Sequence, residues 1–141
     1  MKMARCLAGM ALAMLLTLPV AADNGESPQA AVEAYFQSIV EGDHDRSLLL
    51  LAGLAPRIDV ATLGTIIDGN KLTASAYGEL RGFELVNVKI DSPSMKSYYY
   101  ILRYKQQPAG IRLILYRFDG WELLDYQQME SYKTFALEAA D

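Results

Sequence analysis

Asp43, His44, Asp45 and Ser47 form a compact group whose side-chain types are those of acid–base, nucleophilic or metal chemistry. An imidazole between two carboxylates can shuttle protons, and a serine beside it suggests a hydrolase. A nucleophilic serine also needs an oxyanion hole, however, and the chain has no Gly-x-Ser-x-Gly elbow. A metal site would need ligands from elsewhere, and the chain has one His and one Cys. Because an Asp that caps a helix explains Asp43 or Asp45 fully, we interpret the group as a helix start and expect no metal and no cofactor.

Tyrosine is the second feature that could bind a ligand, because the chain contains nine of them. Tyr98, Tyr100, Tyr104 and Tyr116 fall on the strands proposed below. In adjacent antiparallel strands their rings could line a cavity, and their hydroxyls could hold a polar ligand. They could also form a protein-binding face of the sheet. The simpler interpretation is that tyrosine suits a half-exposed strand.

Charged residues on the same strands offer two further candidates. Arg103 and Arg112 would form a basic stripe that could bind an anionic ligand or an acidic partner. The simpler alternative is cross-strand pairing with acidic residues of the last strand, Glu122 and Asp125. Asp125 also alternates with Leu123 and so shares its face, which would place a carboxylate in an apolar setting. Asp125 is therefore the one candidate for a general acid or base.

The N-terminus has the pattern of a cleaved secretory signal. Lys2 and Arg5 precede an apolar run over 6–18, and small residues follow at 19–22. The run is shorter than the about 20 residues that span a bilayer, although an uncleaved anchor is the rival interpretation. We expect cleavage of residues 1–22, export to the periplasm or the medium, and no stable membrane insertion afterwards.

Charge and cysteine content exclude some classes of partner and chemistry. The formal net charge is −4, and loss of Lys2 and Arg5 with the signal makes the protein two units more negative. This argues against non-specific binding to nucleic acid or to anionic lipid. The only cysteine, Cys6, lies in the signal, so thiol chemistry is not expected of the mature chain.

The remaining residues read as one α+β domain, with helices first and an antiparallel sheet of about four strands afterwards. We expect a flexible lead over 23–26, the domain over 27–130 and a tail over 131–141 that is a short helix or frayed. Aspartates at 43 or 45 and at 59 should cap the second and third helices, and Asp68-Gly69-Asn70 should break or bend the third. Asp119-Gly120 predicts a two-residue type I′ turn. The predicted helices cover 28–41, 43–54 and 59–77, a turn covers 107–110, and the strands cover 83–91, 97–105, 111–118 and 121–128.

The order of these parts resembles the NTF2-like (cystatin-like) superfamily. The resemblance lies in the helix start at 27–36, the Glu-Gly-Asp junction at 41–43 and the hairpin at 118–123, and it spans about 27–130. It implies a curved sheet that wraps helices around a cone-shaped cavity, and often a homodimer through the open sheet face. Members include isomerases, dehydratases, ligand binders and interaction domains, but no family catalytic set maps onto this chain.

Tyrosine is abundant on the predicted strands, and no catalytic set is assembled. Together with the export signal, this suggests a non-catalytic accessory domain of the cell envelope that binds a protein partner or a small ligand. One alternative is a cavity enzyme of isomerase or lyase type that uses Asp125 with Tyr100 or Tyr116. The other is an envelope inhibitor or immunity protein.

Overall fold

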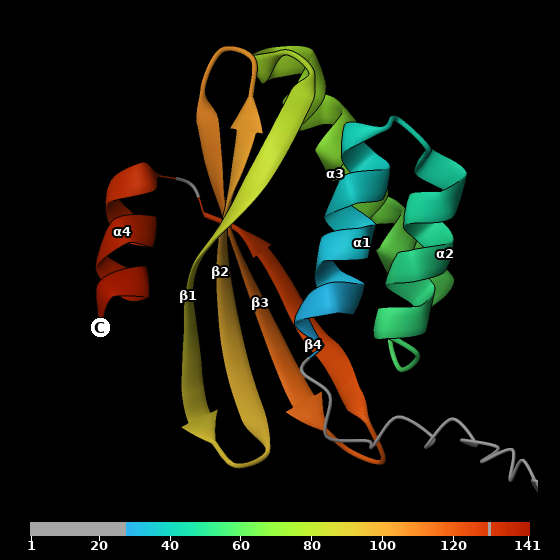
Figure 1. Ribbon diagram of the computed structural model, residues 1–141. Coiled ribbons are helices and arrows are strands. Elements are labelled where there is room, and N and C mark those ends of the chain that lie inside the picture. Colours follow the sequence, from blue (N-terminus) through green and yellow to red (C-terminus); the bar gives the residue numbers. More distant parts are fainter. Residues whose placement is uncertain (1–27, 130) are drawn as a thin grey trace, which may run out of the picture.

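A computed structural model describes residues 28–129 and 131–141, which form an α+β fold (Figure 1). The proposed signal, the flexible lead and residue 27 lie outside the described residues. The strands form one antiparallel sheet in the order β1-β2-β3-β4. The elements are α1 (Gln29–Val40), α2 (His44–Leu54), α3 (Val60–Tyr77), β1 (Leu80–Ser92), β2 (Met95–Tyr104), β3 (Pro108–Arg117), β4 (Trp121–Gln128) and α4 (Tyr132–Ala140).

The helices are divided between the two faces of the sheet. Helices α1, α2 and α3 gather on one face, and α4 lies on the opposite side (Figure 1). The main core lies between the first three helices and the sheet, whereas α4 packs on a separate small cluster of Tyr99, Met129, Phe135 and Ala139. The predicted fold class is therefore confirmed, and the segment after 130 contains a helix. None of the described helices is both long and apolar enough to cross a membrane.

The junction between α1 and α2 forms as the local sequence predicts. Gly42 has a φ of 72°, and its N–H donates to the Ile39 carbonyl over 3.0 Å. The Asp43 N–H donates to the Ser38 carbonyl, so the last turn of α1 closes in a Schellman motif. The Asp43 carboxylate then accepts from the Arg46 N–H over 3.0 Å and caps α2. This junction positions the candidate site described below.

Helix α3 differs from the prediction because it continues through Asp68-Gly69-Asn70 without a break. Asp59 caps its start as expected, accepting from the Thr62 N–H over 2.9 Å. A glycine inside a helix costs only about 1 kcal/mol relative to alanine. Asn70 is 5% exposed and hydrogen-bonded to α1, so tertiary contacts on both sides of Gly69 hold the helix together.

Two of the predicted turns also differ. Pro108 to Gly110 belong to β3, so the chain turns at 105–107. Phe118, Asp119 and Gly120 form a three-residue connection in which neither Asp119 nor Gly120 has a positive φ, so the type I′ prediction is wrong. The Phe118 N–H donates to the Gly120 carbonyl over 2.9 Å and closes the turn instead.

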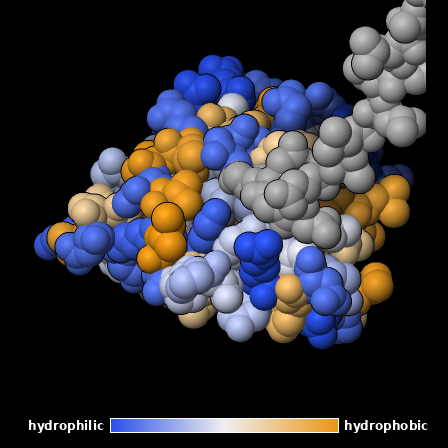
Figure 2. Space-filling model, turned by 60° about the horizontal axis from the view of Figure 1, so that its bottom comes forward, coloured by the Kyte–Doolittle hydropathy of each residue, from blue (hydrophilic) through white to orange (hydrophobic). Residues whose placement is uncertain are grey.

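Exposed hydrophobic side chains are spread over several elements rather than gathered in one patch. They are Leu49, Val60, Leu72, Val86, Ile90, Phe118, Leu124, Tyr132 and Leu137. Figure 2 accordingly shows hydrophobic groups separated by hydrophilic ones over the lower end of the molecule. Scattered exposed apolar residues of this kind are normal and mark no binding site by themselves.

Candidate functional site

The strand tyrosines are core residues. Tyr98, Tyr100 and Tyr104 share the face of β2 that packs against the main core, and they are 1%, 0% and 6% exposed. The Tyr100 ring packs 5.0 Å from the ring of Phe36, measured between centroids. Tyr116 is half-buried beside Phe118, with ring centroids 4.8 Å apart. None of these four tyrosines lines either of the two cavities described below.

The two arginines lie on the outer face of the sheet and have acidic partners. Arg103 is exposed, with its guanidinium 3.3 Å from the Glu84 carboxylate. Arg112 pairs with Glu138 of α4 over 3.0 Å and donates to the Gln127 amide oxygen over 2.8 Å. The structure thus favours ion pairing over a free basic stripe. The acidic partners are Glu84 and Glu138, however, and not the expected Glu122 and Asp125.

Asp125 is exposed and lies on the face of β4 opposite to Leu123. The register shifts between Ile114 and Leu115, so Leu115 pairs with Leu123 while Ile114 pairs with Asp125. This irregularity breaks the alternation that the sequence implied and turns Asp125 away from the core. The expected apolar setting for Asp125 is therefore wrong, because its carboxylate lies on the exposed face.

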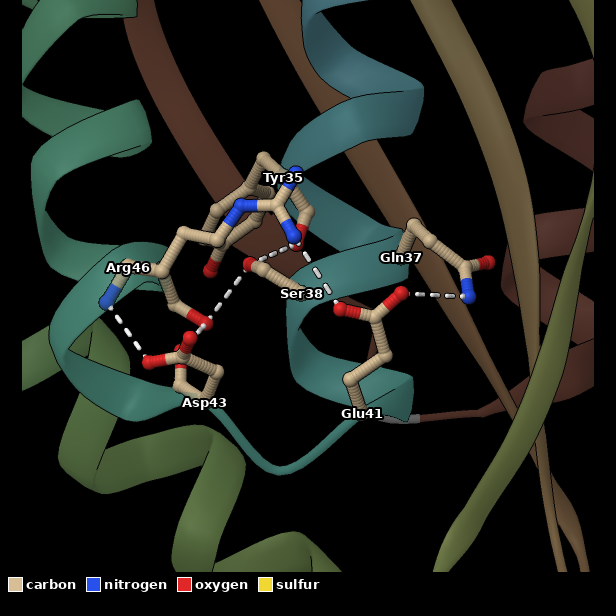
Figure 3. A network of polar contacts seen from close by, with 7 residues as sticks. Tyr35, Gln37, Ser38, Glu41, Asp43 and Arg46 are labelled. Carbon is tan, nitrogen blue, oxygen red and sulfur yellow. Dashed lines mark hydrogen bonds and ion pairs between the residues drawn. The ribbon is translucent and has the colours of Figure 1, made fainter.

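The Asp43-His44-Asp45 group with Ser47 is part of the α1–α2 junction, because Asp43 caps α2 and the other three residues lie in its first turns. Figure 3 shows Asp43 at this junction, with Ser38 and Arg46 around it. Ser47 is fully buried, and its hydroxyl donates to the Asp43 carbonyl over 2.8 Å. The Ser38 hydroxyl lies 2.7 Å away and donates to the Tyr35 carbonyl. The two hydroxyls have one proton each, so only two of these three contacts can be hydrogen bonds at one time. Because both side chains are buried where α1 meets α2, Ser47 holds the helices together and does not face solvent. Among the described residues there is no group of three or more potential metal ligands.

A cleft of about 330 Å³ opens beside this junction. It lies where the end of α1 and the start of α2 meet α3 and the start of β1. Ile39, Val40, Ala74 and Leu80 supply its apolar walls, and Glu41, Gly42, His44, Asn70 and Glu79 supply polar groups. We call it the α1–α2 cleft.

Asn70 is the most buried polar side chain of the α1–α2 cleft. Its amide donates to the Tyr35 hydroxyl over 2.7 Å, and its amide oxygen accepts from the Tyr126 hydroxyl over 3.3 Å. Burial raises the pKa of the Tyr35 and Tyr126 hydroxyls well above the ordinary value, so both stay neutral at physiological pH. Asn70 was not among the predicted site residues. Its position nevertheless continues the inward stripe of Leu63 and Ile67 at helical spacing.

The rim of the α1–α2 cleft carries two carboxylates that are already partly neutralised. Glu41 accepts from Arg46 over 3.1 Å and from Gln37 over 3.2 Å (Figure 3). Glu79 lies 3.5 Å from Arg81 in a more exposed pair. Apolar walls, one buried amide and a weakly acidic rim are suited to binding a small molecule.

Comparison of the chain with protein-family models, with curated proteins and with solved structures gave no match. The resemblance to the NTF2-like superfamily therefore stays a prediction, which rests on the order of the elements and on the residues at 27–36, 41–43 and 118–123.

Proposed function

We propose that this protein is an exported, non-catalytic accessory domain of NTF2-like fold that binds a small ligand in the α1–α2 cleft. The observation that carries the proposal is the buried Asn70 amide beside an open, mostly apolar cavity. A few fixed polar groups in an apolar cleft are the usual composition of a small-molecule site.

The size and charge of the α1–α2 cleft limit the ligand. Its volume of about 330 Å³ is at the small end of the ligand pockets of proteins, which span about 300–1,000 Å³. Glu41 and Glu79 at the rim disfavour an anion. The ligand is therefore a small, mainly apolar molecule with a hydrogen-bonding group and no net negative charge.

Native mass spectrometry of the protein, purified gently from its own cell envelope, tests the proposal. We expect a protein cut after Ala22 that retains a small molecule. Ala74→Met places a longer side chain in the wall of the α1–α2 cleft and should abolish that adduct. Ala76→Met is the matched control, because Ala76 is an exposed residue of the same helix outside the lining.

Three outcomes would contradict the proposal. A protein adduct without a small molecule would favour the interaction domain instead. An adduct that survives Ala74→Met would place the ligand elsewhere. If no adduct appears and the low-molecular-weight extract of the same cells shifts no α1–α2 cleft resonance in NMR, the cleft is not a ligand site.

A further inference from the structure

A second cavity, of about 260 Å³, lies at the C-terminal end of α3, where Tyr77 lines it. It forms where the end of α3, the β2–β3 turn, the end of β4 and the first turn of α4 meet. Figure 1 shows the β2–β3 turn beside the end of α3 at the top of the molecule. The lining residues are Tyr77, Gln107, Pro108, Ala109, Gly110, Gln128, Met129 and Tyr132. We call it the α3–α4 cavity, and it shares no lining residue with the α1–α2 cleft.

The polar groups that described residues supply to the α3–α4 cavity are all neutral, because none of the described residues that line it is Asp, Glu, Lys, Arg or His. Tyr77 and Tyr132 supply aromatic rings, and Gln107 and Gln128 supply amides. The Gln128 amide oxygen accepts from the Thr73 hydroxyl over 3.1 Å, which leaves its two N–H donors. Among the described residues, the Gln107 amide and both tyrosine hydroxyls have no hydrogen-bond partner.

The walls of the α3–α4 cavity are fixed by the fold. The ring of Tyr77 packs edge-on against Tyr104, with centroids 6.1 Å apart. The Tyr77 carbonyl accepts from the Gln106 N–H over 2.8 Å, which ties the end of α3 to the β2–β3 turn. The Met129 N–H donates to the Gly110 carbonyl over 2.9 Å. A site that is already formed needs little ordering when a ligand binds.

We propose that the α3–α4 cavity binds a neutral, hydroxyl-rich ligand of the size of one sugar ring. Sugar hydroxyls both donate and accept, as do the amides and phenols of the lining. The apolar C–H face of a sugar packs on an aromatic ring such as that of Tyr77 or Tyr132. A charged ligand would lose its hydration without gaining a counter-charge, and a purely apolar one would bury the amides without partners.

Binding in the α3–α4 cavity also acts on α4. Tyr132 is the first residue of α4, whereas Tyr77 and Gln107 belong to the main body of the fold. A sugar that contacts both sides therefore stabilises the docked position of α4 by mass action.

An NMR titration of the exported protein tests the proposal. Glucose and N-acetylglucosamine are the probes, with glucose 6-phosphate and glucosamine as charged counterparts. We expect saturable shifts confined to the α3–α4 cavity for the neutral sugars, and slower amide exchange in α4. Gln107→Ala should weaken binding about tenfold, which corresponds to about 1.4 kcal/mol. The matched control is Gln106→Ala, whose exposed side chain lies outside the lining.

Several results would overturn the proposal. One is that neutral sugars cause no saturable shifts, even at high millimolar concentration. Another is that the charged sugars bind as tightly as the neutral ones, or more tightly. A third is that Gln106→Ala weakens sugar binding as much as Gln107→Ala does. Shifts with pentaproline but not with sugar would assign the α3–α4 cavity to a peptide. Ala74→Met should leave sugar binding unchanged. The experiment therefore tests the α3–α4 cavity independently of the proposed ligand site in the α1–α2 cleft.

Discussion

Gly110→Ala tests how α4 is held on the sheet. The Phe135 ring lies directly on Gly110, and a Cβ added there would come within 2.5 Å of its Cγ and 2.9 Å of its Cβ. Phe135 is 1% exposed, so it cannot turn away without leaving its site. Besides Phe135, α4 buries only the small side chain of Ala139 in this cluster, and it makes polar contacts such as the Arg112–Glu138 pair and the hydrogen bond of 2.7 Å from Asn87 to the Ala139 carbonyl. The substitution should therefore lift α4 from the sheet.

The magnitude follows from two opposing effects. Overpacking of a well-packed site costs about 1–3 kcal/mol. Replacing glycine with alanine restricts the unfolded chain, which stabilises the folded protein by about 0.4–1 kcal/mol. We expect a net loss of about 1–2 kcal/mol in the free energy of unfolding, measured with urea. Because α4 packs on its own cluster, its amides should exchange much faster in the variant, while those of α1 to α3 stay protected.

A double-mutant cycle gives the result that would refute this reasoning. Phe135→Ala alone should cost about 3–5 kcal/mol if α4 stays docked, and less if the helix simply detaches. In the Phe135→Ala background, Gly110→Ala should become neutral or slightly stabilising, because the clash is gone. An equal cost in both backgrounds would mean that Phe135 does not lie on Gly110. Gly120→Ala, with nothing within 4 Å of its added Cβ, is the control and should be nearly neutral.

Further predictions concern the glycines of the helices, the buried amide and two ionisable groups. Gly69→Ala should raise the free energy of unfolding by about 1 kcal/mol if α3 is continuous, and Gly42→Ala, at positive φ, should lower it by about 1 kcal/mol in the same urea experiment. Asn70→Ala leaves two buried hydroxyls without their partner and should cost about 1–3 kcal/mol by calorimetry. Burial raises the pKa of Tyr104 from 10.0 to about 12, so the folded protein keeps a proton that the unfolded chain loses. The free energy of unfolding should therefore not depend on this group below pH 10, and it should fall as the pH rises from 10 to 12. Urea unfolding at several pH values across that range measures this. Asp125→Asn should change stability by less than about 0.5 kcal/mol and leave any retained ligand in native mass spectra unchanged.

Features that depend on a few neighbouring residues could be predicted from the sequence. The cap at Asp43 and the stop at Gly42 are local hydrogen-bond and φ requirements, which only certain residue types satisfy. The common face of Tyr98, Tyr100 and Tyr104 follows from the period of two in an unbroken strand. The sequence therefore predicted that helices come first and an antiparallel sheet follows.

Features that depend on contacts between distant segments could not be predicted. The irregularity that moves Asp125 to the opposite face depends on how β4 pairs with β3, which no local pattern encodes. The partner of Arg112 was missed because Glu138 lies on α4, a helix whose docking was not foreseen. Asn70 looked like part of a helix break, and only its contact with Tyr35, 35 positions away, shows why the helix continues.

The burial of the tyrosines changes how a binding role should be tested. Replacing Tyr100 with alanine would remove a fully buried ring and its hydroxyl contact to Glu33, so lost binding would report unfolding as readily as a lost ligand contact. Tyr77 and Tyr132 are different, because part of each remains accessible beside a cavity and their hydroxyls have no partner among the described residues. Phenylalanine at either position keeps the ring packing and removes only the hydroxyl. A loss of ligand affinity at unchanged stability in those variants would therefore identify a binding tyrosine, which no substitution at Tyr100 can do.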